Sequence, residues 1–287
     1  MNIVVTGGSG KVGRATIREL LAHGHQVLNL DRAPLAERLC PFTQVDLTDF
    51  GEVMGALSGI DQQPTGTVEA VVHLAAIPGP SQRPDHVTFA ENTVSTYNIF
   101  EACRRLGIHN IVSASSETLL GYPFAEPPRS VPVDESVRES RVSYALSKLL
   151  GEVMAEEYAR EHPAMKFICL RFSNVLDDAD YAQAQGWQDD PQIRRWNLWS
   201  YIDVRDAAQA VRLGLESDLT GMHAFIIANA DTVMHRPSRE LMAEVFPDVP
   251  FTADIPGTQS LFTIQKARTM LGFNPKHGWR QRSSGRD

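Results

Sequence analysis

Short apolar runs alternate with longer amphipathic stretches through the first 171 residues. Near-continuous apolar runs are typical of strands buried on both faces of a parallel sheet, and they occur at residues 3–5, 26–30, 70–74, 110–114 and 166–171, with a further run ending at residue 45. Helical periodicity fills the intervals at residues 12–22, 50–57, 87–106 and 142–160. This alternation predicts an α/β fold with a doubly wound parallel sheet.

The pattern changes after residue 171. Residues 172–199 are polar and irregular, and they are followed by a helix at 204–216, a strand at 224–228, a helix after Pro237 and a last short helix within 261–271 that Gly272 closes. We therefore expect a dinucleotide-binding domain at 1–171, to which 200–228 return. A small substrate-binding lobe is expected from 172–199 and 229–280, and a flexible tail from 281–287.

Composition narrows the class of protein. The chain has 287 residues, of which 43% are hydrophobic and 22% charged, as in ordinary globular proteins. Its formal net charge of −8 argues against nucleic-acid binding. Three cysteines without paired spacing, Cys40, Cys103 and Cys169, predict neither disulfides nor a metal site. No apolar run approaches the roughly 20 residues of a membrane span, and no basic leader precedes the first strand, so we expect a cytoplasmic protein.

A glycine-rich loop lies directly between the first strand and the first helix. Gly7, Gly10 and Gly13 stand in the sequence Thr-Gly-Gly-Ser-Gly-Lys-Val-Gly. In this context the glycines allow a tight turn, a close approach of the backbone to a pyrophosphate, and close packing of helix on strand. The first turn of the helix adds free N–H groups and the positive end of its dipole. The loop predicts dinucleotide binding.

The end of the second apolar run bears on the choice of dinucleotide. Asp31 stands there, 18 residues after Gly13. A carboxylate at this point accepts hydrogen bonds from the adenosine ribose hydroxyls and repels a 2′-phosphate, which favours NAD. Arg32 follows directly and keeps NADP open as an alternative.

Tyr144 and Lys148 are four residues apart within a predicted helix and so share one face. A phenol titrates near pH 10, and a neighbouring ammonium favours its ionised form, which can then act as a base at neutral pH. Ser116 follows the fifth predicted strand, at the sheet edge where ligands bind in α/β folds. Its hydroxyl can bond a substrate oxygen, although a capping role explains such a serine equally well.

Taken in order, these motifs resemble the extended short-chain dehydrogenases/reductases of the NAD-dependent epimerase/dehydratase group. The resemblance runs to about residue 280, and it also rests on residues 46–47, 73–76, 170–175, 201–206 and 271–273. It implies a Rossmann-type sheet with a small C-terminal substrate lobe, NAD as cofactor, a small-molecule substrate and a homodimer built from the two long helices. In this pattern His73 is a structural residue at a strand end rather than a general base.

The resemblance also implies roles for individual residues. Ser116 would polarise a substrate oxygen, Tyr144 would transfer its proton, and Lys148 would bind the nicotinamide ribose and lower the Tyr pKa. The expected cofactor-binding residues are Gly7, Gly10, Lys11, Val12, Gly13, Asp31, Arg32, Asp46, Leu47, Leu74, Ala75, Ala76, Asn92, Ala114, Tyr144, Lys148, Phe172 and Asn174. The expected substrate-binding residues are Ile77, Ser116, Glu117, Asn174 and Arg195.

Departures from the family pattern bear on the substrate. Nucleotide-sugar members carry Tyr-Gly-Pro after the Asn of the sixth-strand motif, whereas this chain reads Asn174-Val-Leu-Asp-Asp-Ala-Asp. The segment from Asn174 to Tyr201 is also short, and its aspartates would repel a pyrophosphate. The layout is similar to that of uronate dehydrogenases, except that Glu117-Thr-Leu stands after the serine.

Three functions follow from these patterns. The first is NAD-dependent oxidation or reduction of a secondary alcohol or ketone in a small sugar-like substrate. The second is epimerisation or dehydration of a sugar or nucleotide sugar with tightly bound NAD. The third is a dinucleotide-sensing module without catalysis, which retention of Tyr144 and Lys148 disfavours.

Overall fold

A seven-stranded parallel sheet forms the centre of the computed structural model, which describes residues 1–59 and 67–283. The strand order is β3-β2-β1-β4-β5-β6-β9, and β7 pairs with β8 in a separate two-stranded sheet. The strands are β1 (Asn2–Thr6), β2 (Gln26–Asp31), β3 (Phe42–Gln44), β4 (Ala70–His73), β5 (Asn110–Ser116), β6 (Lys166–Phe172), β7 (Val175–Leu176), β8 (Ile202–Asp203) and β9 (Gly221–Ile227).

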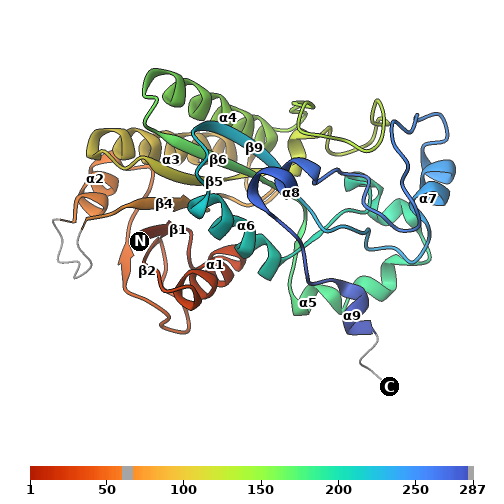
Figure 1. Ribbon diagram of the computed structural model, residues 1–287, viewed down its shortest axis with the longest axis horizontal. Helices are drawn as coiled ribbons and strands as arrows, with labels where there is room; N and C mark the ends of the chain where they lie inside the picture. Colours follow the sequence, from red (N-terminus) through yellow and green to blue (C-terminus); the bar gives the residue numbers. More distant parts are fainter. Residues whose placement is uncertain (60–66, 284–287) are drawn as a thin grey trace. The chain divides into compact units, whose positions relative to one another are not determined.

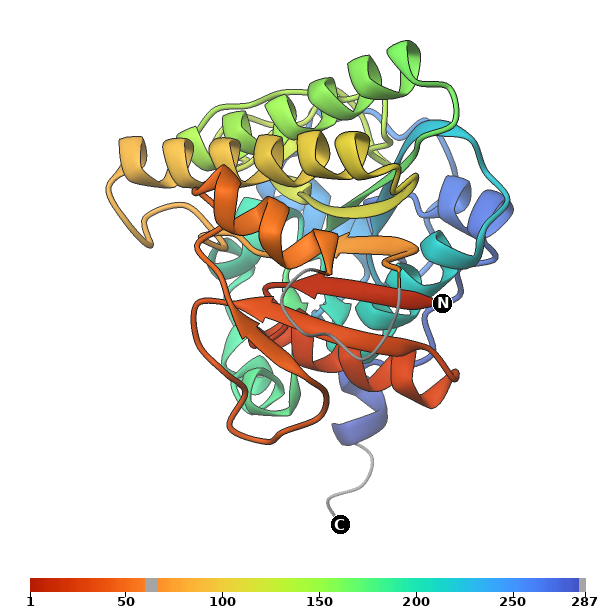
Figure 2. The same ribbon diagram turned by 90° about the vertical axis from the view of Figure 1, so that its left-hand side faces the viewer.

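Helices cover both faces of the large sheet. Helices α2, α3 and α4 lie on one face and α1 and α6 on the other (Figures 1 and 2). Within the described ranges, no helix combines the length and apolarity needed to cross a membrane. The helices are α1 (Lys11–Ala22), α2 (Phe50–Ser58), α3 (Asp85–Leu106), α4 (Ser143–Glu161), α5 (Asp178–Tyr181), α6 (Val204–Glu216), α7 (Ser238–Val245), α8 (Gln265–Leu271) and α9 (Trp279–Ser283), with 3-10 turns η1 (Glu117–Leu119), η2 (Ala184–Trp187) and η3 (Pro191–Asn197).

The predicted fold class is confirmed, and most elements lie within one or two residues of their predicted bounds. The fifth strand is longer than predicted, because β5 continues to Ser116. Residues 172–199, expected to be irregular, contain β7, α5, η2 and η3. The tail expected from Gln281 begins inside α9, and residues 284–287 lie outside the described residues.

Apolar side chains of the sheet and of α3 and α4 form the core beneath one face. Val4 and Val71 from neighbouring strands are buried there with Ile99. The rings of Phe100 and Phe167 meet edge to face with centroids 4.8 Å apart, a favourable geometry for aromatic pairs. The three cysteines are buried, and none of them is joined to another described cysteine by a disulfide.

The chain divides into two compact units. The first consists of Met1–Ser115, Val142–Leu170 and Ala208–Ala224, and the second of Ser116–Arg141, Arg171–Ala207 and the chain from Phe225. From the sequence, residues 116–141, residue 171 and the returning segment 200–228 are expected in the dinucleotide domain. In the structure, residues 116–141, 171, 200–207 and 225–228 cluster with the second unit. This unit therefore contains β5's last residue and everything that follows it up to Arg141.

Buried tryptophans organise the second unit. Trp199 is fully buried, and its indole N–H donates to the Pro191 carbonyl at 2.7 Å. Trp279 donates in the same way to Thr232 at 3.0 Å. Arg171 is also buried and donates to the Glu135 and Val137 carbonyls. These bonds from side chains to backbone hold irregular segments that have no sheet ladder of their own.

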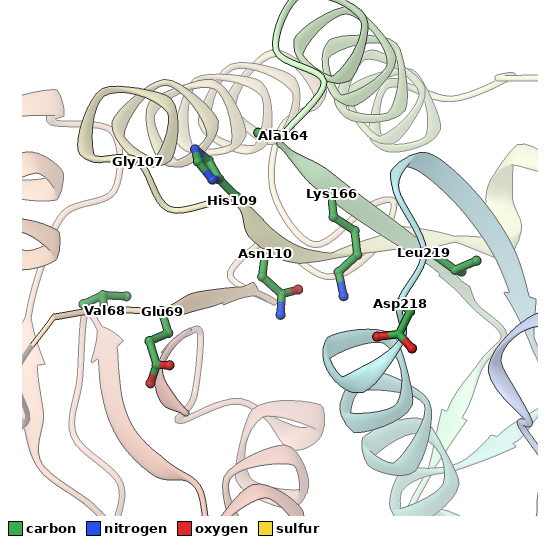
Figure 3. A pocket seen from close by; sticks show the side chains of 9 residues that line it. All are labelled: Val68, Glu69, Gly107, His109, Asn110, Ala164, Lys166, Asp218 and Leu219. Carbon is green, nitrogen blue, oxygen red and sulfur yellow. The ribbon is translucent and has the colours of Figure 1, made fainter.

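A polar pocket of about 540 Å³ opens at the amino ends of β4, β5 and β6 (Figure 3). Its lining includes Glu69, His109, Lys166 and Asp218. The Lys166 ammonium donates to the carbonyls of Gly214, Leu215 and Ser217 at 2.8–3.1 Å, so it caps the C-terminus of α6. Ligands of α/β sheets bind beyond the carboxyl ends of the strands, so this pocket lies at the opposite edge from the expected site.

Candidate active site

The loop between β1 and α1 closes tightly at two glycines. Gly7 has a φ of +70°, and a Cβ there would lie 2.5 Å from the Ala75 nitrogen. A Cβ on Gly13 would lie 2.2 Å from the Gly7 carbonyl oxygen. Side chains at either position would push the loop out of place. Backbone therefore packs directly against backbone where the loop after β1 meets α1 and the chain after β4. We call this arrangement of Gly7, Gly13 and Ala75 the glycine cradle.

The residues of this cradle fit a pyrophosphate. Gly10 is the N-cap of α1, and no side chain caps the helix there. The first turn of α1, which begins with Lys11 and Val12, directs its N–H groups and the positive end of the helix dipole toward the loop. The lysine adds a positive charge beside the same turn.

The end of β2 carries a network of charges. Both oxygens of Asp31 accept backbone N–H groups, from Ser9 at 3.0 Å and Arg32 at 2.7 Å. The Arg32 guanidinium donates to Glu91 at 2.8 Å and to Asp46 at 3.3 Å. The bond to Glu91 is the main cause that raises the pKa of Arg32. The structure therefore brings three of the predicted residues together and adds Glu91, which the sequence analysis missed.

The chain after β4 is fastened to α3. The side-chain oxygen of Asn92 accepts the Ile77 N–H at 2.8 Å, and its amide donates to the Ile77 carbonyl at 3.2 Å. Leu74 donates its N–H to the Thr6 carbonyl, which continues the ladder with β1. Leu74 and Ala75 thus lie against Gly7 of the glycine loop, where the sequence predicts the cofactor, and Ile77 is held by α3. Leu47 is positioned similarly, since its carbonyl accepts from Asn98 at 3.0 Å.

His73 is fully enclosed at the end of β4. Its two ring nitrogens lie 2.8 Å from the Thr6 hydroxyl and 3.2 Å from the Thr96 hydroxyl. The Thr96 hydroxyl already donates to the Asn92 carbonyl, so Nε2 donates and Nδ1 accepts. Burial, reinforced by the charge of Lys148, lowers the pKa of His73 to about 3. The neutral, fully bonded imidazole has no capacity left for proton transfer.

Tyr144 and Lys148 are both buried on α4. The Lys148 ammonium lies 5.8 Å from the centre of the Tyr144 ring and donates to the Ala114 carbonyl at 2.9 Å. Burial lowers the pKa of Lys148 to about 8. A surface pair would be solvated, whereas this ammonium is held beside the phenol at the carboxyl end of β5.

The last residues of β5 turn into η1. Ser115 donates to the buried carboxylate of Glu152 at 2.6 Å within the first unit. Ser116, in the second unit, is the N-cap of η1 and accepts the Thr118 N–H at 3.2 Å. The Ser116 hydroxyl therefore accepts a hydrogen bond from its own turn, and its proton can still be donated to another acceptor. Capping and substrate contact are compatible roles for this serine.

Glu117 lies in a buried polar cluster of the second unit. Its carboxylate accepts from the Ser173 hydroxyl at 2.5 Å and from the Asn197 amide at 3.2 Å. Burial raises its pKa to about 7, against the opposing effects of these bonds and of the Arg194 charge. Both carboxylate oxygens thus accept hydrogen bonds from the protein. Glu117 thereby connects η1 to Ser173 after β6 and to Asn197 in η3.

Arg194 is the second charged member of this cluster. It lies between the rings of Trp187 and Trp196, with its guanidinium carbon 4.6 and 4.8 Å from their centres. It donates to the Asn174 side chain at 3.0 Å and to the Ser200 carbonyl at 3.1 Å. Burial lowers its pKa to about 10. The sequence motifs indicate Asn174 but not Arg194, for which the nearby Trp187 and Trp196 are the one signal in the sequence.

Arg195 and Phe172 are two further predicted residues of the second unit. Arg195 is partly exposed and donates to Gln192 within η3. Phe172 is buried at the end of β6. Because η3 is a 3-10 helix, two successive arginines lie on different sides of it, and only the first of them reaches Asn174.

Relatives with assigned activities cover most of this chain. UDP-glucose 4-epimerase from Lacticaseibacillus casei is 31% identical over 96% of this chain and 92% of its own length. The same enzyme from Erwinia amylovora is 27% identical over 76% of this chain and 65% of its own length. L-arabinose 1-dehydrogenase (NAD(P)(+)) from Haloferax volcanii is 28% identical over 76% of this chain and 83% of that protein.

Solved structures share the fold. A mutated uronate dehydrogenase superposes with a TM-score of 0.68 over 99% of this chain and 86% of that one, at 21% identity. The similarity confirms the Rossmann-type fold that the motifs predict.

The sequence pattern of the NAD dependent epimerase/dehydratase family matches residues 3–186. The match includes the glycine cradle, Asp31, and the Tyr144–Lys148 pair. The chain belongs to the NAD-dependent epimerase/dehydratase family, and the protein is an NAD-dependent enzyme of the short-chain dehydrogenase/reductase type.

Proposed function

We propose that the protein transfers a hydride between NAD and a secondary alcohol or ketone of a small sugar-like substrate, with Tyr144, Lys148 and Ser116 as catalytic residues. The observation that carries the proposal is the buried Lys148 ammonium beside the Tyr144 ring, held by the Ala114 carbonyl. Buried titratable groups at the carboxyl ends of strands are characteristic of active sites. The relation to L-arabinose 1-dehydrogenase supports the same chemistry.

Tyr144 acts as the base for the substrate hydroxyl. Its phenol loses a proton more readily beside the Lys148 ammonium, because the positive charge stabilises the phenolate. The bond to Ala114 keeps that ammonium in place on α4. NAD, when bound, supplies the carbon that accepts the hydride.

Ser116 stabilises the substrate oxygen. The Thr118 N–H occupies one lone pair of its hydroxyl, so the proton is free to point at an oxygen on which negative charge develops. One donor of this kind contributes on the order of 10²- to 10³-fold in rate.

The substrate segment favours a small molecule. It carries five aspartates between Asn174 and Tyr201, and two of them, Asp177 and Asp180, form a capping box at α5. These carboxylates oppose the binding of a diphosphate. The family's Tyr-Gly-Pro stretch does not follow Asn174 in this sequence, which also favours a small substrate.

Epimerisation of a sugar is the second candidate function. It is favoured by the 31% identity to a UDP-glucose 4-epimerase over 96% of this chain. The two candidates differ in their products, since an oxidoreductase releases NADH whereas an epimerase restores NAD in each cycle. Absorbance at 340 nm with sugars, sugar acids and nucleotide sugars distinguishes them. NADH formation with a free sugar or sugar acid supports the first, and an altered sugar without NADH supports the second.

An apolar strip on the first unit supports a homodimer. Val94 and Tyr97 on α3, and Leu146 and Val153 on α4, are each 38–48% exposed. The two helices lie side by side in both views (Figures 1 and 2). Exposed apolar residues concentrated on one pair of helices indicate a contact surface. A second copy that packs its own α3 and α4 there would complete a four-helix bundle.

We expect Tyr144→Phe to abolish turnover and to leave NAD⁺ binding nearly intact, because only the phenol oxygen is lost. Lys148→Ala should lower turnover and also weaken NAD⁺ binding. Ser116→Ala should lower kcat by roughly 10²- to 10³-fold. Steady-state kinetics on the substrate found in the screen and calorimetry with NAD⁺ measure these effects. Full turnover by Tyr144→Phe would remove the catalytic assignment and revive the dinucleotide-sensing alternative.

We expect NAD⁺ to bind about tenfold more tightly than NADP⁺, because Asp31 opposes a 2′-phosphate. Asp31→Ala should narrow or reverse this preference. Calorimetry with both cofactors measures it. Tighter NADP⁺ binding by the unmodified protein would contradict the prediction and show that Arg32 dominates.

We expect Glu117→Gln to stabilise the protein more at pH 8 than at pH 5. The folded pKa of about 7 exceeds the ordinary 4.5, so the folded state binds the extra proton and its stability declines as the pH rises from 4.5 to 7. The full effect is about 3 kcal/mol at most. Arg194 faces the carboxylate from η3, and Tyr122 is the other titratable neighbour.

Thermal unfolding at both pH values measures this difference. Glu240→Gln, which alters an exposed acid on α7 of the same unit, is the matched control and should shift the melting temperature equally at both. An equal shift for Glu117→Gln would show that Glu117 is ionised throughout this range.

We expect light scattering to give twice the monomer mass of 31.8 kDa. Tyr97→Asp should yield the monomer, because a carboxylate on the strip would be buried without a partner. Leu21→Asp, on the exposed side of α1, is the control and should leave the dimer intact. A monomeric unmodified protein at micromolar concentration would contradict the proposal.

A further inference from the structure

Arg32 directly follows Asp31, where a cation could bind a 2′-phosphate, but its guanidinium already donates hydrogen bonds to carboxylates of the protein. Its backbone N–H bonds Asp31, and its guanidinium donates to Glu91 on α3 and to Asp46 after β3. The distances are 2.8 Å to Glu91 and 3.3 Å to Asp46. Glu91 is therefore the closer of the two carboxylates and the principal restraint.

The two carboxylates differ in what else they bind. Asp46 also accepts the N–H and the hydroxyl of Thr48 on the same oxygen. The Glu91 side chain is 31% exposed, against 49% for Asp46, and it reaches Arg32 from a separate helix. The bond from Arg32 to Glu91 thus ties the end of β2 to α3.

The network as a whole has a negative charge. Asp31, Glu91 and Asp46 each contribute −1 and Arg32 contributes +1, which leaves −2 at the end of β2. A 2′-phosphate placed there meets an arginine whose charge is already balanced and carboxylates that repel it. The Asp31 carboxylate alone does not account for the repulsion of a 2′-phosphate, because an arginine without other partners beside it would offset its charge.

We propose that Glu91 is a specificity-determining residue that excludes NADP by holding Arg32 away from the cofactor's 2′ position. The inference rests on the proposed placement of the adenosine ribose beside Asp31. Removal of the Glu91 charge releases Arg32 and leaves one negative charge fewer in the network. The freed guanidinium can then donate to the phosphate, as arginine does most effectively among cationic side chains.

The test is calorimetry of the full-length protein with NAD⁺ and NADP⁺ at about 0.1 M ionic strength, where close charges are only partly screened. The readout is the ratio of the NADP⁺ to the NAD⁺ dissociation constant. In Glu91→Gln this ratio should fall about tenfold relative to the unmodified protein. In Glu91→Gln combined with Arg32→Ala the fall should be lost, because the released cation is absent.

Asp85→Asn is the matched control, since it removes the same charge from an exposed position on the same helix. Its ratio should equal that of the unmodified protein. The proposal is overturned by an unchanged ratio in Glu91→Gln, by an equal fall in Asp85→Asn, or by a fall that persists without Arg32. An unmodified protein that binds no NAD⁺ would instead refute the proposed placement of the cofactor.

Discussion

The close approach of β1, α1 and the chain after β4 is the constraint on which the first unit depends. It exists because Gly7 and Gly13 lack a Cβ, so backbone meets backbone where any side chain would collide. The same turn carries Ser9, whose N–H bonds Asp31 at the end of β2. The two glycines therefore fix the shape of this loop, and the loop in turn orients the Asp31 carboxylate, so a distortion of the loop would disturb both.

Burial shifts the pKa of three titratable groups near the strand ends, with a different consequence for each. His73 is neutralised, with a pKa near 3 and hydroxyl partners for both nitrogens. Lys148 keeps a proton at neutral pH although burial lowers its pKa to about 8. Glu117 titrates near 7 with donors on both oxygens. Burial of the charged form costs free energy in each case. Of the three groups, Lys148 is the one whose charge lies beside the Tyr144 phenol, where it stabilises the phenolate.

Local patterns were sufficient to predict the sheet, most helices and the residues of the glycine loop, because near-continuous apolar runs and glycine spacing are encoded within a few residues. Partners distant in sequence were not predictable. Arg32 and Glu91 are 59 residues apart, and no local signal joins them. Within η3 the choice between Arg194 and Arg195 depends on the turn that follows, where Leu198 and Trp199 adopt positive φ. A helical wheel cannot resolve two successive residues in such a segment.

The buried pair of Glu117 and Arg194 bears on substrate size. A buried guanidinium is an obvious anchor for a phosphate, but here it lies between two indole rings and its charge is matched by a carboxylate in the same cluster. Drawing Arg194 toward a phosphate would leave Glu117 buried without its counter-charge, which costs several kcal/mol. The cluster is therefore better suited to joining Ser173, Asn174 and Asn197 into a rigid wall than to gripping a diphosphate. Under the proposed function, this arrangement favours a small polyhydroxylated substrate, which is selected by hydrogen bonding and shape.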